Sequence, residues 1–340
     1  MLGRIIGTVV VVLVAAGLAV LFWPQLLGLQ TAPGMAQAIA LRGAAAAIAF
    51  IAVILLTLLA LLVRPVRGLL AGLAIVTLAF VVAHVVVIAN RGALGAALPA
   101  PAPGAVTVLA WNTFGEAPSA EDVVDLIEET GADIVSLPET GYDRGAELVA
   151  ELAARGIEMQ QLTFAYDTIA KTNSTTLLVR TSLGPYTADT TTPTTLGPPS
   201  LVATPVDGDG PVIAAVHTTR PGASDTSRWR ADLRWLAELC AEPDLIVAGD
   251  LNSTIDHWAG LGDPAVPGAE IGGCADAAAA NGSGGIGTWP ANVPALLGAP
   301  IDHVLTGSSW TATGFRVVQS EDGAGSDHRP VLAQLVPSAG

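Results

Sequence analysis

The first 104 positions of this 340-residue chain contain no acidic residue, and the whole chain contains a single lysine, Lys171. The first 104 residues hold five arginines, whereas residues 105–340 hold all 30 acidic residues and ten basic ones, for a net charge of −20. A protein that grips nucleic acid regardless of sequence needs clustered Lys and Arg against the phosphates. The composition therefore argues against that class.

Cysteine is also scarce, with Cys240 and Cys274 alone. Neither belongs to a Cys-x-x-Cys pair, which argues against a zinc knuckle. The two thiols either form one disulfide, as expected of a domain outside the cell, or remain two buried free thiols. The topology inferred below favours the disulfide.

Three long apolar runs fill the acid-free part of the chain. They cover residues 5–23, 43–63 and 68–88, and each has about the 20 residues with which an α-helix crosses the hydrocarbon core. A helix is required there because lipid offers no partner for backbone N–H and C=O groups. The first run also fits a signal peptide, but the two that follow directly do not. We therefore predict that residues 1–90 form a membrane module of three transmembrane helices.

The flanking arginines predict the orientation of this module. Arg4 precedes the first run, and Arg64 and Arg67 lie between the second and the third. Arg42 and Arg91 lie on the other side. Because positive residues concentrate in cytoplasmic segments, we expect the amino terminus in the cytoplasm and everything after the third run outside the plasma membrane.

Two further features adjoin the third run. His84 lies near its outer end, where we expect the imidazole to reach the headgroup zone. Residues 91–104 are rich in Pro, Ala and Gly, and alternating prolines favour extended, semi-rigid chain. They predict a linker that spaces residues 105–340, the catalytic domain, off the bilayer.

Residues 105–340 alternate irregularly between strand and helix patterns. Apolar and β-branched runs bounded by turn residues predict strands, and amphipathic runs predict helices, two of them closed by glycine. Several predicted strands follow one another directly, which favours two sheets packed face to face with helices outside, an α/β sandwich. The predicted helices cover residues 119–130, 145–155 and 227–240, and the predicted strands cover 105–111, 133–137, 174–179, 201–204, 212–216, 245–249, 302–305, 313–318 and 331–336.

Polar side chains gather where these predicted strands begin or end. A rigid sheet presents such positions at one edge, where several side chains can act on one ligand. Carboxylates, amides and imidazoles held together in this way are the groups that a metal-dependent phosphoesterase needs. The candidate site residues are Asn112, Glu139, His217, Asp250, Asn252, Asp302, Asp327 and His328.

Three of these residues offer the oxygen ligands that a hard cation prefers. Mg²⁺ is usually held by one or two carboxylates, with water and substrate phosphate completing its shell. Glu139 and Asp327 are the candidate carboxylates, and Asn112 is the candidate neutral oxygen. The sequence therefore predicts a site for Mg²⁺, with Mn²⁺ as the alternative cation.

The other five residues predict catalytic roles. Positions i and i+2 of an extended segment face the same way, so Asp250 and Asn252 address one spot, where one aligns water and the other binds a phosphoryl oxygen. His328 is the candidate base that takes a proton from water, and Asp302 is the carboxylate that holds its tautomer. His217 is the candidate proton donor to the departing oxygen.

Several residues near these motifs leave two interpretations open. Arg220, Arg228, Arg230 and Arg234 follow His217 in the sequence. One or two of them could contact a phosphate, or all could lie on a solvated helix face. Trp289, in a glycine-rich segment, either stacks on the substrate or covers the core.

The order of these motifs resembles that of the endonuclease/exonuclease/phosphatase superfamily, which has the DNase I-like fold. The motifs are Trp111-Asn112, Pro138-Glu139, Val216-His217, Gly249-Asp250-Leu251-Asn252, Ile301-Asp302-His303 and Ser326-Asp327-His328. The resemblance implies that Asn112 and Glu139 help to bind Mg²⁺, and that Asp327 is a metal-site carboxylate. It also implies that His217 lies beside the scissile phosphate, that Asp250 and Asn252 orient nucleophile and phosphate, and that Asp302 and His328 form a carboxylate–imidazole pair. One departure is Pro138, because the family usually has Gln before the metal-binding Glu.

The three-helix anchor resembles a subgroup of bacterial membrane-bound members. Our first hypothesis is therefore a phosphodiesterase or phosphatase that is held outside a bacterial plasma membrane and acts on a lipid-linked or small phosphate ester of the cell envelope. One alternative is an extracellular nuclease of the same fold, and another is a catalytically inactive envelope protein that binds a partner.

Overall fold

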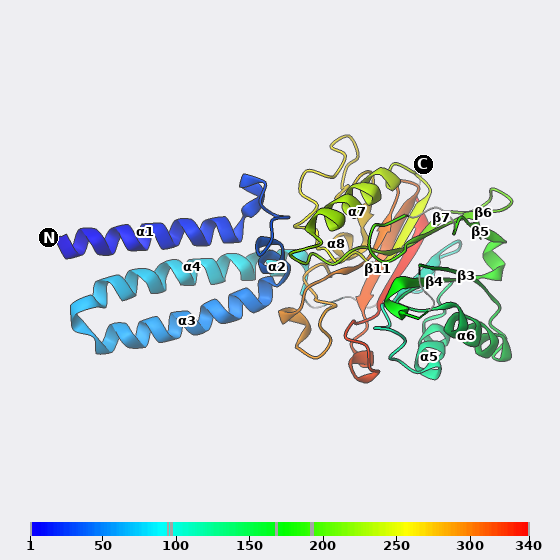
Figure 1. The fold of residues 1–340 in the computed structure, drawn as a ribbon, viewed down its shortest axis with the longest axis horizontal. Helices are drawn as coiled ribbons and strands as arrows, with labels where there is room; N and C mark the ends of the chain where they lie inside the picture. Colours follow the sequence, from blue (N-terminus) through cyan, green and yellow to red (C-terminus); the bar gives the residue numbers. More distant parts are fainter. Residues whose placement is uncertain (1, 94, 96–97, 167–168, 191–193, 339–340) are drawn as a thin grey trace.

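The computed structural model describes five stretches of the chain, residues 2–93, 95, 98–166, 169–190 and 194–338. Its amino-terminal part is a bundle of three long helices, α1 (Leu2–Phe22), α3 (Arg42–Leu62) and α4 (Arg67–Arg91). They lie side by side and project away from the rest of the molecule (Figure 1). Each is long and apolar enough to cross a membrane, which confirms the three predicted apolar helices. Of the predicted linker, residues 94, 96 and 97 lie outside the described residues.

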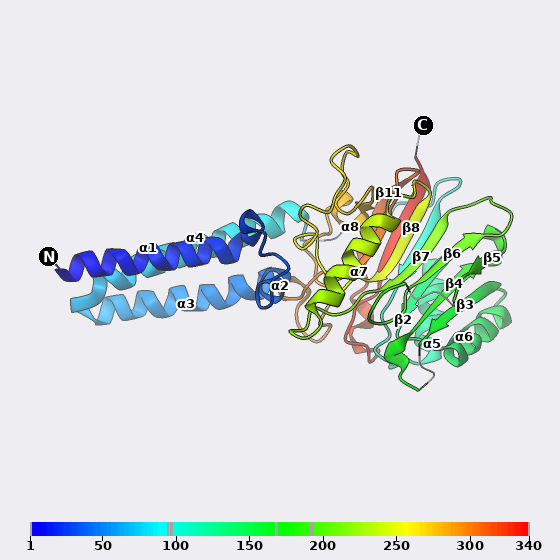
Figure 2. The same cartoon turned by 45° about the horizontal axis from the view of Figure 1, so that its top comes forward.

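A short segment between α1 and α3 contacts the part of the chain that forms the sheets. It contains the 3₁₀-helix η1 (Pro24–Leu27) and the helix α2 (Met35–Ala40), neither of which the sequence predicted. The amide of Gln25 donates to the backbone oxygen of Asp256 at 3.1 Å, and the amide of Gln30 donates to that of Ala259 at 3.1 Å. The segment therefore lies where the helical bundle meets the sheets (Figure 2).

The described residues that follow the bundle contain two six-stranded sheets. The first contains β1 (Val106–Ala110), β2 (Ile134–Pro138), β3 (Met159–Ala165), β4 (Ser174–Arg180), β11 (Trp310–Val317) and β12 (Val331–Pro337), and the second contains β5 (Tyr186–Ala188), β6 (Leu201–Pro205), β7 (Val212–His217), β8 (Leu245–Asp250), β9 (Ala275–Asp276) and β10 (Asp302–Thr306). The strand orders are β11-β12-β1-β2-β4-β3 and β5-β6-β7-β8-β10-β9.

The two sheets pack face to face around a shared apolar core. Val108 and Leu177 of the first sheet belong to the same buried cluster as Ile213, Ile246 and Val304 of the second. The helices cover the outer faces. Helices α5 (Ala120–Thr130) and α6 (Tyr142–Ala154) pack on the first sheet, α7 (Thr226–Leu239) packs on the second, and α8 (Ala277–Ala280) follows β9. The predicted two-sheet α/β sandwich is confirmed.

Local signals explain why the predicted helix over residues 119–130 forms. The Ser119 side chain accepts a hydrogen bond from the backbone N–H of Asp122, and the Asp122 carboxylate accepts one from the Ser119 backbone in return. This capping box satisfies two backbone donors that the first turn leaves free. Gly131 ends the helix with φ +62°, a left-handed conformation that favours glycine.

The sequence missed three strands, and all three lie at sheet edges. β3 is an edge strand of the first sheet, and β5 and β9 are the two edge strands of the second. Edge strands are short or half exposed, so their apolar pattern is weak. β3 carries Gln160 and Gln161 in its middle, and β9 has only two residues.

A disulfide joins Cys240, at the end of α7, to Cys274, just before β9. Of the two alternatives that the sequence left open, the structure therefore has the bonded pair. The bond ties the outer helix of the second sheet to the segment that leads into its edge strand.

A buried ion cluster joins the helical bundle to the sandwich. The carboxylate of Asp256 accepts hydrogen bonds from Arg42 at 2.6 and 2.7 Å and from Arg91 at 2.7 and 2.9 Å. Burial alone would raise the pKa of Asp256, but the two guanidiniums more than offset it and hold that pKa below its usual range. The carboxylate is therefore charged and pairs with both helices at once.

The expectation for His84 was wrong. Its side chain is 1% exposed and packs inside the bundle, edge-on to the rings of Phe22 and Phe80. Its Nδ1 lies 3.4 Å from Arg42 Nη1. Hydropathy placed the residue near the end of a helix, but it does not show which side of the helix faces the neighbouring helices.

Asp256→Asn should loosen the junction between the two halves. The change leaves the buried guanidinium of Arg42 and the half-buried one of Arg91 without a counter-charge, which costs about 3 kcal/mol in comparable buried pairs. We expect the midpoint of thermal unfolding of the full-length protein in detergent to fall by several degrees. The matched control is Asp209→Asn, on the exposed turn after β6. Equal midpoints for the two variants would contradict this account.

Candidate active site

Strand register brings three of the predicted residues together. His217 and Asp250 end the parallel neighbours β7 and β8 and stand directly opposite each other. Asp302 begins β10 and pairs with Asp250 across the antiparallel register. The ends of the parallel pair β1 and β2 deliver Asn112 and Glu139 from the first sheet. The site therefore lies where both sheets end at one edge.

The predicted residues converge on one cleft of about 780 Å³. Its lining includes seven of the eight candidates, and Asp302 lies behind His328, to which it is hydrogen-bonded. A cleft of this size accommodates a drug-sized ligand. The seven candidates that line it are Asn112, Glu139, His217, Asp250, Asn252, Asp327 and His328.

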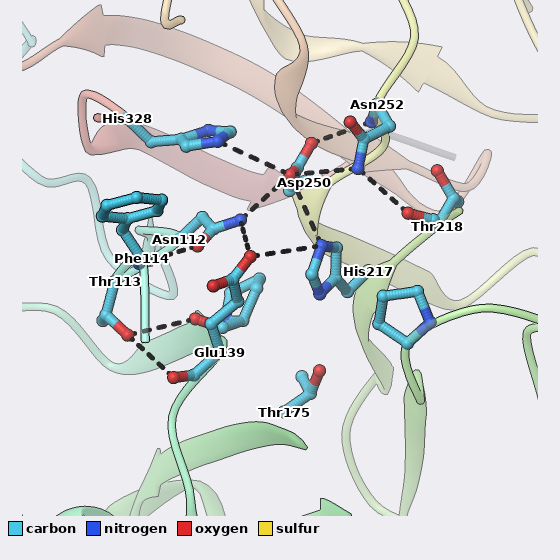
Figure 3. A network of polar contacts seen from close by, with 12 residues as sticks. Asn112, Thr113, Phe114, Glu139, Thr175, His217, Thr218, Asp250, Asn252 and His328 are labelled. Carbon is cyan, nitrogen blue, oxygen red and sulfur yellow. Dashed lines mark hydrogen bonds and ion pairs between the residues drawn. The ribbon is translucent and has the colours of Figure 1, made fainter. Parts of the chain in front are cut away.

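Asp250 lies at the centre of a hydrogen-bond network (Figure 3). Its Oδ2 accepts from the side-chain amides of Asn112 at 3.0 Å and Asn252 at 3.2 Å. Its Oδ1 accepts from the backbone N–H of Asn252 at 2.8 Å. The Asn112 amide also donates to Glu139 Oε1 at 3.3 Å. Two amides therefore fix a carboxylate that is only 1% exposed.

His328 is held as an imidazolium by the carboxylates around it. Its Nδ1 donates to Asp302 at 2.9 Å, and its Nε2 lies 3.8 Å from both Asp250 Oδ2 and Asp327 Oδ1. Burial alone would lower the pKa of His328, but Asp302 and Asp250 more than offset it and raise that pKa to about 10. The predicted pairing of Asp302 with His328 is therefore present in the structure.

Asp250 and His217 are shifted toward their neutral forms. Burial raises the pKa of Asp250 to about 7, although the nearby His328 lowers it. Burial lowers the pKa of His217 to about 3. His217 Nε2 lies 3.6 Å from Asp250 and 3.9 Å from Glu139. Near neutral pH the site therefore holds a carboxylate that can take up a proton beside a neutral imidazole and a charged one.

Two carboxylate oxygens in the cleft lack a hydrogen-bond donor. Among the described residues, Glu139 Oε2 and Asp327 Oδ1 are buried and have no hydrogen-bond partner. Burial raises the pKa of Glu139, and the charge of Asp327 raises it further. Buried carboxylate oxygens without donors are costly unless a cation compensates them. These oxygens therefore fit a divalent ion of the kind that prefers oxygen ligands.

A second candidate metal group consists of Asp250, Asp302 and His328, whose ligand atoms lie within 4.8 Å of one another. However, the Nδ1 of His328 already donates to both oxygens of Asp302, at 2.9 and 3.2 Å. This pair is satisfied without an ion. The unpartnered oxygens of Glu139 and Asp327 are the better ligand set on chemical grounds.

The backbone is strained around the cleft. Glu139 and Asn252 have φ of +63° and +43°, and Phe114 has φ of +50°. Such left-handed conformations are costly for residues with a side chain and collect at functional sites. Here they turn the chain sharply at the ends of β1, β2 and β8, which aims Glu139 and Asn252 into the cleft.

Two residues that support the site were not among the candidates. Ser326 Oγ donates to the backbone oxygen of Asn112 at 2.7 Å and accepts from the N–H of His328 at 3.0 Å. The backbone oxygen of Thr218 accepts from the Asn252 amide at 2.9 Å. Ser326 is part of a predicted motif and Thr218 follows another, so their position in the sequence was the only available signal.

The structure places Trp289 and the four arginines, whose roles the sequence left open, in different surroundings. The indole N–H of Trp289 donates to Asp327 Oδ2 at 2.9 Å, so this ring holds a candidate metal ligand in addition to lining the cleft. Arg220 and Arg228 line the cleft, whereas Arg230 donates to the backbone oxygen of Thr31 at 2.6 Å. Arg234 lies on the exposed face of α7.

Comparisons with known proteins bear on the fold and the family of this chain. A comparison with curated proteins gives no match. Among solved structures, the endonuclease/exonuclease/phosphatase from Beutenbergia cavernae DSM 12333 is 18% identical, with a TM-score of 0.51 over 69% of this chain and 72% of that one. A humanized D. rerio TDP2 is 17% identical, with a TM-score of 0.52 over 68% of this chain and 99% of that one. A family protein from Leptotrichia buccalis C-1013-b is 12% identical, with a TM-score of 0.50 over 67% and 98%.

These structures share the fold of this chain at low identity. The sequence supplies the family, because the model of the Endonuclease/Exonuclease/phosphatase family matches residues 109–328, well over half of the 340 residues. The matched range begins in β1 and ends at His328, so it spans all eight candidate residues. The chain belongs to the endonuclease/exonuclease/phosphatase family.

Proposed function

We propose that this protein is a divalent-metal-dependent phosphoric ester hydrolase that acts on a phosphodiester or phosphomonoester. The observation that carries the proposal is the convergence of Glu139 and Asp327, each with an unpartnered buried oxygen, on the cleft that also holds Asp250 and His328. Family membership supports a hydrolase. The cleft brings together groups that would bind a cation, hold a water molecule and offset the negative charge of a phosphate.

Glu139 and Asp327 would hold the cation, with Asn112 beside them. Mg²⁺ suits this set, since it takes one or two carboxylates and completes its shell with water and phosphate oxygens, and Mn²⁺ suits the same ligands. When bound, the ion would supply positive charge to the phosphate as negative charge builds up in the transition state. Asn112 now turns its amide nitrogen toward Glu139, so its oxygen would face an ion only after the amide turns over.

The protonation states of the site favour different roles for Asp250 and His328. A base must be deprotonated at the working pH, and Asp250, with a pKa of about 7, meets this condition. His328 keeps its proton, so it would bind a phosphoryl oxygen as a cation rather than take a proton from water. Asn252 would orient Asp250 and contact the phosphate. His217, neutral at every working pH, would donate a hydrogen bond near the departing oxygen rather than deliver a proton.

We further propose that residues 1–90 span a bacterial plasma membrane, that 91–104 link the two parts, and that the catalytic domain, 105–340, lies outside the cytoplasm. The Cys240–Cys274 disulfide supports this orientation, because such bonds persist in oxidising compartments. The arginines flanking the apolar runs support it too. The substrate would then be a phosphate ester of the cell envelope, lipid-linked or small.

Glu139→Gln should abolish binding of the cation without unfolding the protein. Glutamine keeps the shape but offers a weaker, neutral oxygen in place of the charged ligand. Titration calorimetry of the full-length protein in detergent with Mn²⁺ should show binding to wild type and none to the variant. Glu121→Gln, on the exposed side of α5, is the matched control. Wild-type affinity in Glu139→Gln would rule out this ligand set.

The full-length protein should hydrolyse phosphate esters in the presence of Mg²⁺ or Mn²⁺ and lose this activity with a chelator. The panel is bis-p-nitrophenyl phosphate, p-nitrophenyl phosphate, an envelope lipid extract and plasmid DNA. We expect kcat/KM to rise with pH as Asp250 loses its proton, with a midpoint at or below 7 because a bound cation favours the charged carboxylate, and to fall near pH 10 as His328 loses its proton.

Two variants separate the roles in this assay. Asp250→Asn should lower kcat by at least about 100-fold, in line with the loss of a general base. His328→Gln should retain weak activity and lose the alkaline decline. Retained turnover in Asp250→Asn would refute the role of Asp250 as the base. An unchanged alkaline decline in His328→Gln would refute the role of the His328 imidazolium. Inactivity of the wild type on every substrate would favour a binding protein. Cleavage of DNA alone would favour the nuclease.

The orientation can be tested with single cysteines in intact cells. Asp209→Cys, on the exposed turn after β6, should react with a membrane-impermeant maleimide, whereas Pro65→Cys, between α3 and α4, should react only after the cells are broken. The two native cysteines are bonded to each other and should not contribute. The opposite labelling pattern would reverse the proposed topology.

A further inference from the structure

The catalytic domain does not enclose the cleft by itself. Four residues of the segment between α1 and α3 also line it, namely Ala36, Gln37, Ala40 and Leu41. They lie on α2 and directly before α3, at the end of the helical bundle that faces the sandwich (Figures 1 and 2). One wall of the candidate site is therefore built from the part of the chain that carries the apolar helices.

Specific contacts fix this wall against the loop that follows Asp250. His257 Nδ1 accepts from the backbone N–H of Thr254 at 2.8 Å, so its proton lies on Nε2, which donates to the backbone oxygen of Ala36 at 2.9 Å. The pKa of His257 is lowered to about 4, chiefly by burial, which keeps the ring neutral. On the other side, the Gln37 amide donates to the backbone oxygen of Pro221, which also lines the cleft.

The Asp256 cluster anchors the same loop to the ends of two long helices. Arg42 is the first residue of α3, directly after Leu41, and Arg91 is the last residue of α4. Asp256 is four residues beyond Asn252 in the chain. The position of α2 is therefore set by the apolar helices and the catalytic loop together, and it cannot shift without disturbing both.

The cleft has an apolar part of its wall at the helical bundle. The candidate catalytic residues are charged or polar, whereas the bundle contributes Ala36, Ala40 and Leu41 beside the polar Gln37. The lining also includes Ala299 and Ile301 from the segment that leads into β10. This segment and the bundle touch, because the start of α3 at Gly43 approaches the backbone of Leu296 so closely that a Cβ would collide with it. An apolar end of this kind suits a hydrocarbon chain rather than a second charged group.

We propose that α2 and Leu41 form a subsite for the apolar chain of a phosphate ester that is embedded in the bilayer, so that the headgroup reaches Asp250 while the chain stays against the helical bundle. The inference rests on the proposed hydrolase function and on the membrane location of α1, α3 and α4. It deepens that function by assigning the substrate class, a long-chain phosphate ester, to residues outside the family domain. In this account Leu41 is a specificity residue, because it contacts the chain and not the reacting atoms.

A structural role of α2 alone predicts a different outcome. A wall that only supports the catalytic loop would affect all substrates equally when it is altered. A subsite for the chain affects KM for long-chain esters and leaves kcat and short-chain esters unchanged. The length of the substrate chain therefore separates the two roles.

The test uses the full-length protein in lipid nanodiscs with Mn²⁺. Hexadecyl phosphate and butyl phosphate form one pair of substrates, and their p-nitrophenyl diesters form the other, so that both monoesters and diesters are covered. The variant is Leu41→Gln, which keeps the volume and removes the apolar surface. The matched control is Leu26→Gln, which makes the same change in η1, where the side chain is 71% exposed and is not part of the cleft lining.

We expect wild type to prefer the hexadecyl over the butyl ester, and Leu41→Gln to raise KM for the hexadecyl ester at least about fivefold, as loss of part of a buried leucine contact requires. Its kcat, and both constants for the butyl ester, should stay within about twofold of wild type, and Leu26→Gln should match wild type throughout. Equal use of both chain lengths, or equal effects of Leu41→Gln on both, would overturn the subsite and leave the hydrolase standing. No cleavage of any of these esters by wild type would remove the hydrolase and the subsite together.

A measurement on the wild-type protein avoids any dependence on how the variant folds. Hexadecyl phosphate with a diazirine at the end of its chain is incorporated in the nanodiscs, illuminated and mapped by mass spectrometry. Adducts on residues 36–41 that excess hexadecyl phosphate suppresses would support the subsite. Adducts confined to α1, α3 and α4 would contradict it.

Discussion

Asp250 is a carboxylate buried at the meeting point of two sheets, and the arrangement of the site depends on how its charge is compensated. Removing a carboxylate from water is costly unless donors or a counter-charge replace the water. Here two asparagine amides, one backbone N–H and the His328 imidazolium replace it. The compensation is incomplete, because burial still raises the pKa of Asp250 to about 7. An acid poised near neutral pH is what proton transfer from water requires.

The same loop carries a second buried carboxylate with the opposite balance. Asp256 has two guanidiniums in direct contact and stays charged, whereas Asp250 has one imidazolium at 3.8 Å and is poised to take up a proton. One end of the loop is thus a rigid anchor, and the other is chemically responsive. Because His257 also holds Ala36, the anchor fixes the wall of the cleft as well as the loop. Precise geometry at Asp250 would therefore depend on helices that the family domain does not contain.

The sequence predicted the candidate site better than it predicted the surroundings of the site. Strong apolar strands end at or just before Asn112, Glu139, His217 and Asp250. Because the strand ends of two packed sheets meet at one edge, polar residues at those positions were enough to predict that their side chains lie together. The part that α2 plays was not predictable, because six residues between two apolar runs have no signal that relates them to a cleft about 200 positions away in the chain. The inward-facing side of His84 and the edge strands β3, β5 and β9 were missed for the same reason. Each depends on which neighbour packs against it, and that information is tertiary.

The charge of residues 105–340 would give the bundle a role beyond anchoring. A domain with a net charge of −20 repels a free anionic substrate, so electrostatic steering cannot raise the rate of encounter, and the cation in the site would act only at short range. Confinement in a bilayer would replace steering, because a lipid substrate would diffuse in the same plane as the apolar helices that carry the α2 wall of the cleft. On this argument, adding salt should raise the encounter rate with a soluble anionic ester by screening repulsion, and should affect a membrane-embedded ester much less. A salt dependence of the same sign and size for both would mean that the helices hold the domain in place but do not deliver its substrate.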